Sequence, residues 1–121
     1  MATVTHLVTY VDLEDPDAPD WSFSARLEAV LAGGARIVLL DDRGWGGSGG
    51  LADEIRETAL MVTGPDEPFD DRTEQDMADD HFAALSETLR RRGVAISPDE
   101  LARLPHDVEL SKRLRGLLRG K

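Results

Sequence analysis

The sequence contains no cysteine, few aromatic residues and only two lysines. Without cysteine the chain forms neither a disulfide nor a metal site built on thiolates. Aromatic residues make up 5% of the 121 residues and hydrophobic residues 40%, so the core has to be built mainly from Leu, Val, Ile and Ala. A chain of this length has room for one hydrophobic core, and we therefore expect a single domain over residues 1–121.

Long hydrophobic runs are also missing. No stretch approaches the roughly 18 consecutive apolar residues that a membrane-spanning helix needs. The first residues have neither the basic segment nor the cleavage pattern of a secretory signal peptide. Together with the absence of cysteine, these features predict a cytoplasmic protein without a membrane partner.

Charge is distributed unevenly along the chain. The sequence has 24 acidic and 14 basic residues, which gives a net charge of −10. Residues 1–89 hold 20 of the acidic and 5 of the basic side chains, whereas residues 90–121 hold 4 and 9. We call residues 1–89 the acidic body. Because it repels phosphate groups, we expect no nucleic-acid partner. The basic C-terminal part is expected to pack across the acidic body.

Apolar segments that alternate with amphipathic ones predict an α/β fold. Strands that alternate with helices usually form parallel sheets through right-handed crossovers. We therefore expect a three- to four-stranded, mostly parallel sheet with flanking helices and C-terminal helices. The expected strands are residues 4–13, 37–40, 60–62 and a short strand at 94–96.

Helices are predicted between and after these strands. The apolar residues of segment 23–31 recur at helical spacing before a pair of glycines. Thr73 with Asp76 resembles a capping box that starts a long helix, which ends at Gly93. Ser97 followed by proline starts a short helix. The remaining expected helices are 51–58 and a final one with Leu110, Leu114, Leu117 and Leu118 inward. The segment 44–58 has a second interpretation, a loop that joins two antiparallel strands.

Polar clusters follow the first three expected strands, at residues 12–15, 41–45 and 64–67. In a parallel sheet these clusters would meet at the carboxyl edge, which is where ligands bind. The alternative is that they are ordinary polar turns of an acidic protein. The sequence thus gives six candidate binding residues: Asp41, Asp42, Arg43, Trp45, Asp66 and Glu67.

A metal or nucleotide at this edge is not predicted. Asp41 and Asp42 could hold Mg²⁺ with Asp12 or Asp66, but adjacent residues of a strand point to opposite faces. Residues 44–49 match the pattern G-x-G-x-x-G, although the two acids before it would repel a pyrophosphate. We therefore expect no metal and no cofactor, and a flexible loop at 44–50. Trp45 in this loop is either an anchor packed on the domain or an exposed contact residue.

No catalytic group emerges from the remaining residues. His6 and His81 lie on apolar faces, where a histidine is usually a satisfied core residue. His106 precedes Asp107, which is a candidate cap for the last helix. No Ser-His-Asp arrangement stands out, and a thiol nucleophile is excluded. The catalytic residues, if any, are unknown.

Three stretches carry a resemblance to other sequences. They are Leu40-Asp41-Asp42-Arg43-Gly44-Trp45, Gly64-Pro65-Asp66-Glu67-Pro68 and Leu104-Pro105-His106-Asp107-Val108. With them the chain resembles small, acidic hypothetical proteins of actinobacteria. No activity is assigned to such proteins, so the resemblance implies no catalytic residues and only directs attention to these loops.

The acidic body favours a non-enzymatic protein-binding module, immunity-type or regulatory, that captures a basic protein by electrostatic attraction. The alternative is a small α/β enzyme or ligand-binding protein that uses the acidic loops, with or without Mg²⁺. A third possibility is a scaffold or regulatory subunit that forms a homodimer through its C-terminal helix.

Overall fold

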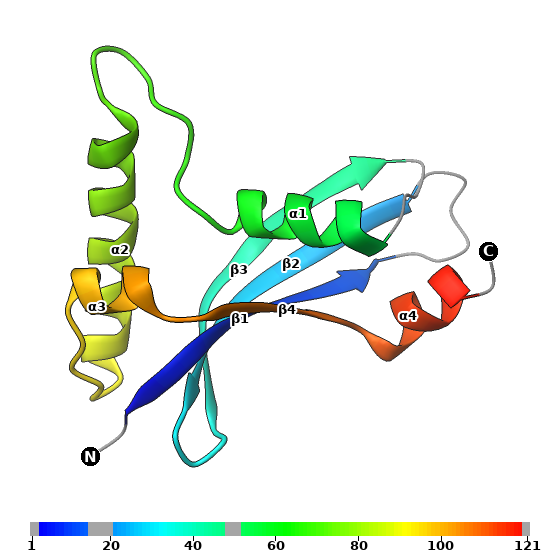
Figure 1. Cartoon of the computed structure of the whole chain (residues 1–121), viewed down its shortest axis with the longest axis horizontal. Helices are drawn as coiled ribbons and strands as arrows, with labels where there is room; N and C mark the ends of the chain where they lie inside the picture. Colours follow the sequence, from blue (N-terminus) through cyan, green and yellow to red (C-terminus); the bar gives the residue numbers. More distant parts are fainter. Residues whose placement is uncertain (1–2, 15–20, 48–51, 120–121) are drawn as a thin grey trace.

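The computed structural model describes residues 3–14, 21–47 and 52–119 (Figure 1). Within these residues, strands and helices follow one another as three strands, three helices, a strand and a helix. The elements are β1 (Val4–Leu13), β2 (Trp21–Leu31), β3 (Arg36–Gly47), α1 (Ala52–Val62), α2 (Glu74–Arg91), α3 (Pro98–Arg103), β4 (His106–Leu110) and α4 (Lys112–Arg119).

The sheet is mixed, and the prediction of a mostly parallel sheet is wrong. Its strand order is β3-β2-β1-β4, with β1 antiparallel to β2, β2 antiparallel to β3, and β1 parallel to β4. The error lies in segment 21–31, which is a strand and not the expected helix. Its alternate residues Phe23, Ala25, Leu27 and Ala29 are all buried. An alternation of this kind places every second side chain on one face of a sheet.

Two other expected strands are absent from the described residues. Segment 60–62 is the last turn of α1, and segment 94–96 has no strand pairing. The fourth strand is instead His106–Leu110, which pairs with β1. Asp107 therefore lies inside a strand and caps no helix. Leu110 ends this strand, and the final helix begins two residues later.

Several predicted elements are confirmed. Residues 4–13 form β1 as expected, and α2 begins after Thr73 with a complete capping box to Asp76. The short helix α3 begins after Ser97, with proline in its first turn. Segment 44–47 continues β3, and residues 48–50 of the expected flexible loop lie outside the described residues.

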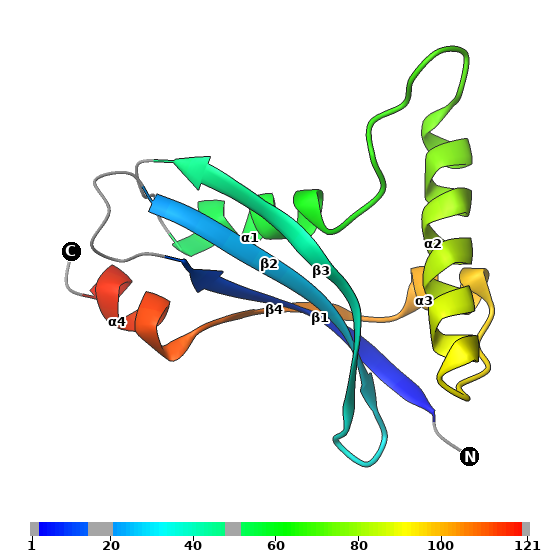
Figure 2. The same ribbon diagram turned by 180° about the vertical axis from the view of Figure 1, so that it is seen from behind.

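The helices leave one face of the sheet open. Helix α1 crosses one face, α2 and α3 pack together at one end, and α4 lies at the other end (Figure 1). The turned view shows the strands in front of α1, with no described helix over this second face (Figure 2). None of the helices among the described residues is both long enough and apolar enough to cross a membrane.

The core consists of two buried clusters on the helix-covered side of the sheet. The first joins Leu7 and Leu27 of the sheet to Leu85 and Leu89 of α2 and Leu101 of α3. The second cluster joins residues of β1, β2 and β4 to Ile55 and Ala59 of α1 and Leu114 of α4. Between these clusters lie the segment after α1 and the side chains that it contacts.

Candidate functional site

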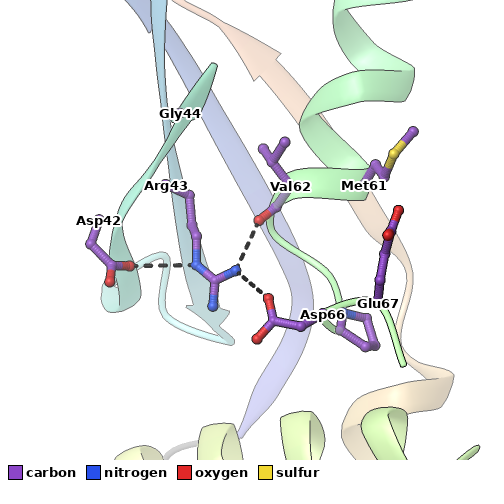
Figure 3. Close-up of a pocket in the computed structure, with 8 residues that line it drawn as sticks. Asp42, Arg43, Gly44, Met61, Val62, Asp66 and Glu67 are labelled. Atoms are coloured by element: carbon purple, nitrogen blue, oxygen red, sulfur yellow. Dashed lines mark hydrogen bonds and ion pairs between the residues drawn. The ribbon is translucent and has the colours of Figure 1, made fainter. Parts of the chain in front are cut away.

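Arg43 is the centre of the predicted site. It pairs in register with Ala25, which is buried on the helix-covered face, so its side chain projects to that face. Its Nη1 donates hydrogen bonds to Asp66 Oδ1 at 3.1 Å and to the Val62 carbonyl at 3.4 Å (Figure 3). Its Nε lies 3.5 Å from Asp42 Oδ1. Arg43 therefore ties β3 to the segment that follows α1.

Four of the six predicted residues come together here. Asp42, Arg43, Asp66 and Glu67 line one cavity of about 310 Å³, and Met61 lies at its rim (Figure 3). Asp41 is exposed and does not line this cavity. We call the four residues with Met61 the Arg43 site.

Trp45 is an anchor and not an exposed contact residue. Its ring stacks on Phe23, with 4.9 Å between the ring centroids and an angle of 20° between the planes. It also packs against the buried cluster under α1 and α4. The sequence alone left both roles open, and the register of β3 on β2, which pairs Trp45 with Phe23, decides between them.

The cluster at Asp12 does not join the Arg43 site. The Asp12 carboxylate accepts hydrogen bonds from the Leu13 amide at 2.8 Å, from Ser111 Oγ at 2.7 Å and from Arg113 Nη2 at 3.1 Å. Burial raises the pKa of Asp12, but the hydrogen bonds from Ser111 and Leu13 and the charge of Arg113 outweigh it and hold the pKa below its usual range. Asp12 thus fixes the start of α4 on β1, where a basic residue of the C-terminal part meets the acidic body.

A second polar cluster lies between α2 and the sheet, and the sequence did not predict it. His106 Nε2 lies 2.7 Å from Thr9 Oγ1, which lies 2.9 Å from Thr63 Oγ1. Thr63 Oγ1 donates to the Ala59 carbonyl at 2.8 Å. The sequence feature that could have indicated this cluster was Thr9, a polar residue in the middle of an apolar strand. Both threonines are fully buried, so their hydroxyls need the partners that they find here.

His81 of α2 lies beside this cluster. Its side chain is only partly buried, so the expectation of a core residue is confirmed only in part. Its ring meets Phe82 edge to face at 5.0 Å between centroids. Burial, and then the charge of Arg43, lowers the pKa of His81, and burial lowers the pKa of His106. Because burial disfavours the charged imidazolium, both rings are neutral at pH 7. His6 lies elsewhere, on β1, with Nε2 4.0 Å from Asp107 Oδ2.

An acidic segment, residues 61–74, runs from the end of α1 to the start of α2. Its five carboxylates are all exposed, and Arg72 is its only basic residue. Two large apolar side chains are exposed among them, Met61 at 70% and Phe69 at 57%. The five acidic residues are Asp66, Glu67, Asp70, Asp71 and Glu74.

The acidic segment is fastened at both ends. Asp66 binds Arg43 of β3, and Arg72 binds the carboxylate of Asp80 on α2. The Arg72 guanidinium also lies over the Phe69 ring, 5.6 Å from its centroid. The segment arches away from the sheet in Figure 1, and these contacts connect its two ends to β3 and to α2.

Metal ligands are not grouped in the part of the chain that the structure describes. No set of three or more His, Asp or Glu side chains is placed there to hold a metal ion. Asp41 and Asp42, the residues considered for Mg²⁺, lie within β3 and not at its carboxyl end. Asp66 reaches Arg43 instead of joining them around a cation.

Comparisons with known proteins give no relative of this chain. No family model matches it, and neither a curated protein nor a solved structure does. The resemblance to actinobacterial hypothetical proteins therefore stays a prediction, and the function has to be inferred from the chemistry of these surfaces.

Proposed function

We propose that this protein is a non-enzymatic binding module, immunity-type or regulatory, that captures a basic protein through its acidic segment. The observation that carries the proposal is the exposure of Met61 and Phe69 among five carboxylates. Methionine and aromatic residues are enriched at the centres of protein interfaces, where they fill pockets of the partner.

The two apolar side chains would supply most of the binding free energy, and the carboxylates would attract the partner to this surface. Burying one such side chain completely contributes about 1.5–3 kcal/mol. Exposed carboxylates contribute less to affinity, but they attract a basic surface and accelerate its encounter with the protein. A basic partner therefore fits this surface better than a neutral or acidic one.

The fastened conformation of the acidic segment also supports binding. Ordering a loose loop on binding costs free energy, and a loop that is already held in place avoids most of this cost. Asp66 to Arg43 and Asp80 to Arg72 provide the attachment. Asp70, Asp71 and Glu74 form no ion pair within the described residues, which leaves them available for a partner's cations.

The enzyme alternative required the three acidic clusters to share one edge of a parallel sheet. In the mixed sheet Asp12 belongs to the β1–α4 junction, Asp41 lies within β3, and Asp66 follows a helix. We therefore propose binding and not chemistry at these loops.

The test is affinity capture with matched variants. Tagged wild-type protein is incubated with a lysate of the source cells, and retained proteins are identified by mass spectrometry. The double variant M61S/F69S removes both apolar contacts. The control V38S removes another exposed apolar side chain, which pairs with Glu28 on the open face of the sheet.

Each retained protein is then purified and titrated against the three forms. We expect a basic protein whose affinity falls at least tenfold with M61S/F69S, stays within twofold with V38S, and weakens as salt is raised. A partner that is acidic, or one that binds M61S/F69S as tightly as the wild type, would refute the proposal.

A further inference from the structure

A cavity of about 180 Å³ lies between α2, the end of α1 and the strands β1 and β4. Its walls include Leu7, Leu27, Phe82 and Leu85, and no carboxylate, lysine or arginine lines it. An engineered apolar cavity of about 150 Å³ in another protein accommodates benzene. The present cavity therefore has the size for one six-membered ring with a small substituent.

The hydrogen bonds of His106 determine which of its ring nitrogens carries the proton. A carbonyl oxygen only accepts, so the Thr63 hydroxyl must donate its single proton to Ala59. The bond between Thr63 and Thr9 must then be donated by Thr9. The Thr9 oxygen therefore accepts from His106, and Nε2 carries the proton. In the neutral ring this leaves Nδ1 as a hydrogen-bond acceptor.

His81 contributes the second polar group of the cavity. It has no hydrogen-bond partner among the described residues, and it lines the cavity together with His106. A neutral imidazole has one N–H donor and one acceptor nitrogen. The two charged side chains that act on its pKa, Arg43 and Asp66, are paired with each other. Two neutral imidazoles thus offer acceptors and a donor inside an otherwise apolar space.

We infer that this cavity is a binding site for a compact, uncharged aromatic hydroxyl compound of the size of phenol. The hydroxyl group donates to one imidazole and accepts from the other, and the ring packs against the leucines and Phe82. An anion finds no free cation in this cavity, and a cation finds no carboxylate. The cavity lies on the inner side of the acidic segment, of which Thr63, Gly64 and Pro65 line it, whereas the proposed protein partner would contact the exposed side chains of that segment.

Phenol and toluene are the probes, because they have nearly the same size and differ in the hydroxyl group. Calorimetric titration at pH 7.5 should show that phenol binds the wild type about three- to tenfold more tightly than toluene, which is the effect of one net hydrogen bond. H81L removes one of the two imidazoles and should reduce the preference for phenol over toluene, because only the hydrogen bond to His106 remains. If H81L does not fold, H81M replaces it.

A pair of tryptophan variants tests the location of the site. Leu60 lines the cavity and is 39% exposed, so L60W can fill the cavity without disturbing the core. Its neighbour Met61 does not line this cavity, and M61W is the control. We expect L60W to abolish binding of both probes and M61W to leave it within twofold. Absence of binding to the folded wild type, equal affinity for both probes, or unchanged binding by L60W would overturn the inference.

Discussion

At Gly44 the backbone of β2 leaves no room for a side chain on β3. A Cβ atom at this position would lie 2.5 Å from the Phe23 carbonyl oxygen, which is backbone and cannot move aside. We expect G44A to lower the free energy of unfolding by about 1–3 kcal/mol, because overpacking forces a shift of the strand. Urea unfolding followed by circular dichroism measures this change.

Gly46 provides the matched control for Gly44. It lies two residues further along the same strand, and its nearest neighbour to an added Cβ is the Trp21 carbonyl at 3.9 Å. G46A should therefore change the free energy of unfolding by less than about 0.5 kcal/mol. Equal effects of the two substitutions would contradict the close approach at Gly44.

Glu28 is a nearly buried carboxylate on the open face of the sheet, where no described helix covers it. It accepts from Arg26 Nε at 2.9 Å and from Arg36 Nη1 at 3.1 Å. E28Q weakens two charge-assisted bonds in a partly desolvated place, and we expect a loss of about 1–3 kcal/mol in the free energy of unfolding. E109Q is the control.

Glu109 accepts from the same Arg36, but its side chain is 48% exposed. An exposed ion pair contributes less than about 1 kcal/mol, so E109Q should unfold at nearly the wild-type urea concentration. Equal stability of E28Q and E109Q would mean that the ion pairs of Glu28 do not stabilise the open face.

Arg43 and Asp66 lie together as expected, but not for the expected reason. Arg43 and Asp66 were expected to meet because parallel strands end at one edge. They meet because α1 follows β3 and ends beside it, and because an arginine side chain is long enough to reach the next segment. Residue types and their order in the chain indicated the pair, but not the geometry that forms it.

At the scale of elements, the ambiguous segments were those whose apolar residues fit both the period of a helix and the period of a strand. Phe23 and Leu27 are four residues apart, which suits a helix as well as a strand. The alternation with Ser24 and Arg26 favours the strand, and the strand is what β2 adopts. Local pattern alone did not decide between them, since the two neighbouring strands supply the pairing that makes β2 stable.

Two further elements show why the rest could not be predicted. The apolar run 60–62 indicated a buried strand, yet Leu60 and Met61 are exposed at the end of α1. Strand β4 is short, and its residues Asp107 and Glu109 are exposed, so only pairing with β1 reveals it. Helices α2 and α3 were predictable because their first residues carry a local signal that does not depend on tertiary contacts.

The capping box of α2 is such a local signal, and the effect of removing it can be predicted. The Thr73 side chain accepts from the Asp76 amide at 3.1 Å, and the Asp76 carboxylate accepts from the Thr73 amide at 3.0 Å. T73A should lower the free energy of unfolding by about 1 kcal/mol. The control T88A removes a hydroxyl that bonds back to the Ala84 carbonyl within the same helix, and it should be neutral or slightly stabilising. Thermal unfolding of the two variants distinguishes a cap from a general preference for threonine.

For the whole molecule, the sequence indicated the uneven charge, and the structure shows how part of it is paired. Arg113 of the basic C-terminal part binds Asp12, as expected. Leu114 of α4 is fully buried, and Leu117 and Leu118 pack against the body. The predicted homodimer through this helix would therefore have to use its charged side, and sedimentation across protein concentrations tests it.

The pH dependence of stability follows from two half-buried histidines and from three carboxylates. Burial lowers the pKa values of His81 and His106, so the unfolded chain binds protons at a higher pH than the folded protein does. The free energy of unfolding therefore falls as pH drops below about 6.5, the ordinary pKa of histidine. The pKa values of Asp12, Asp76 and Glu87 are held low by hydrogen bonds and by nearby arginines. Their contribution is present above about pH 4 and is lost as pH falls through their folded pKa values.

Protonation also reduces the repulsion within a chain of net charge −10, which acts in the opposite direction. A comparison of wild type and H81L at constant ionic strength separates the two effects, because both proteins carry the same acidic body. Urea unfolding at steps between pH 8 and pH 4.5 should show that the wild type loses more stability than H81L between pH 7 and pH 5.5. Parallel curves in that range would mean that His81 takes up its proton as easily in the folded protein as in the unfolded chain. A cavity that keeps its imidazoles neutral, as the phenol site requires, would then be ruled out at His81.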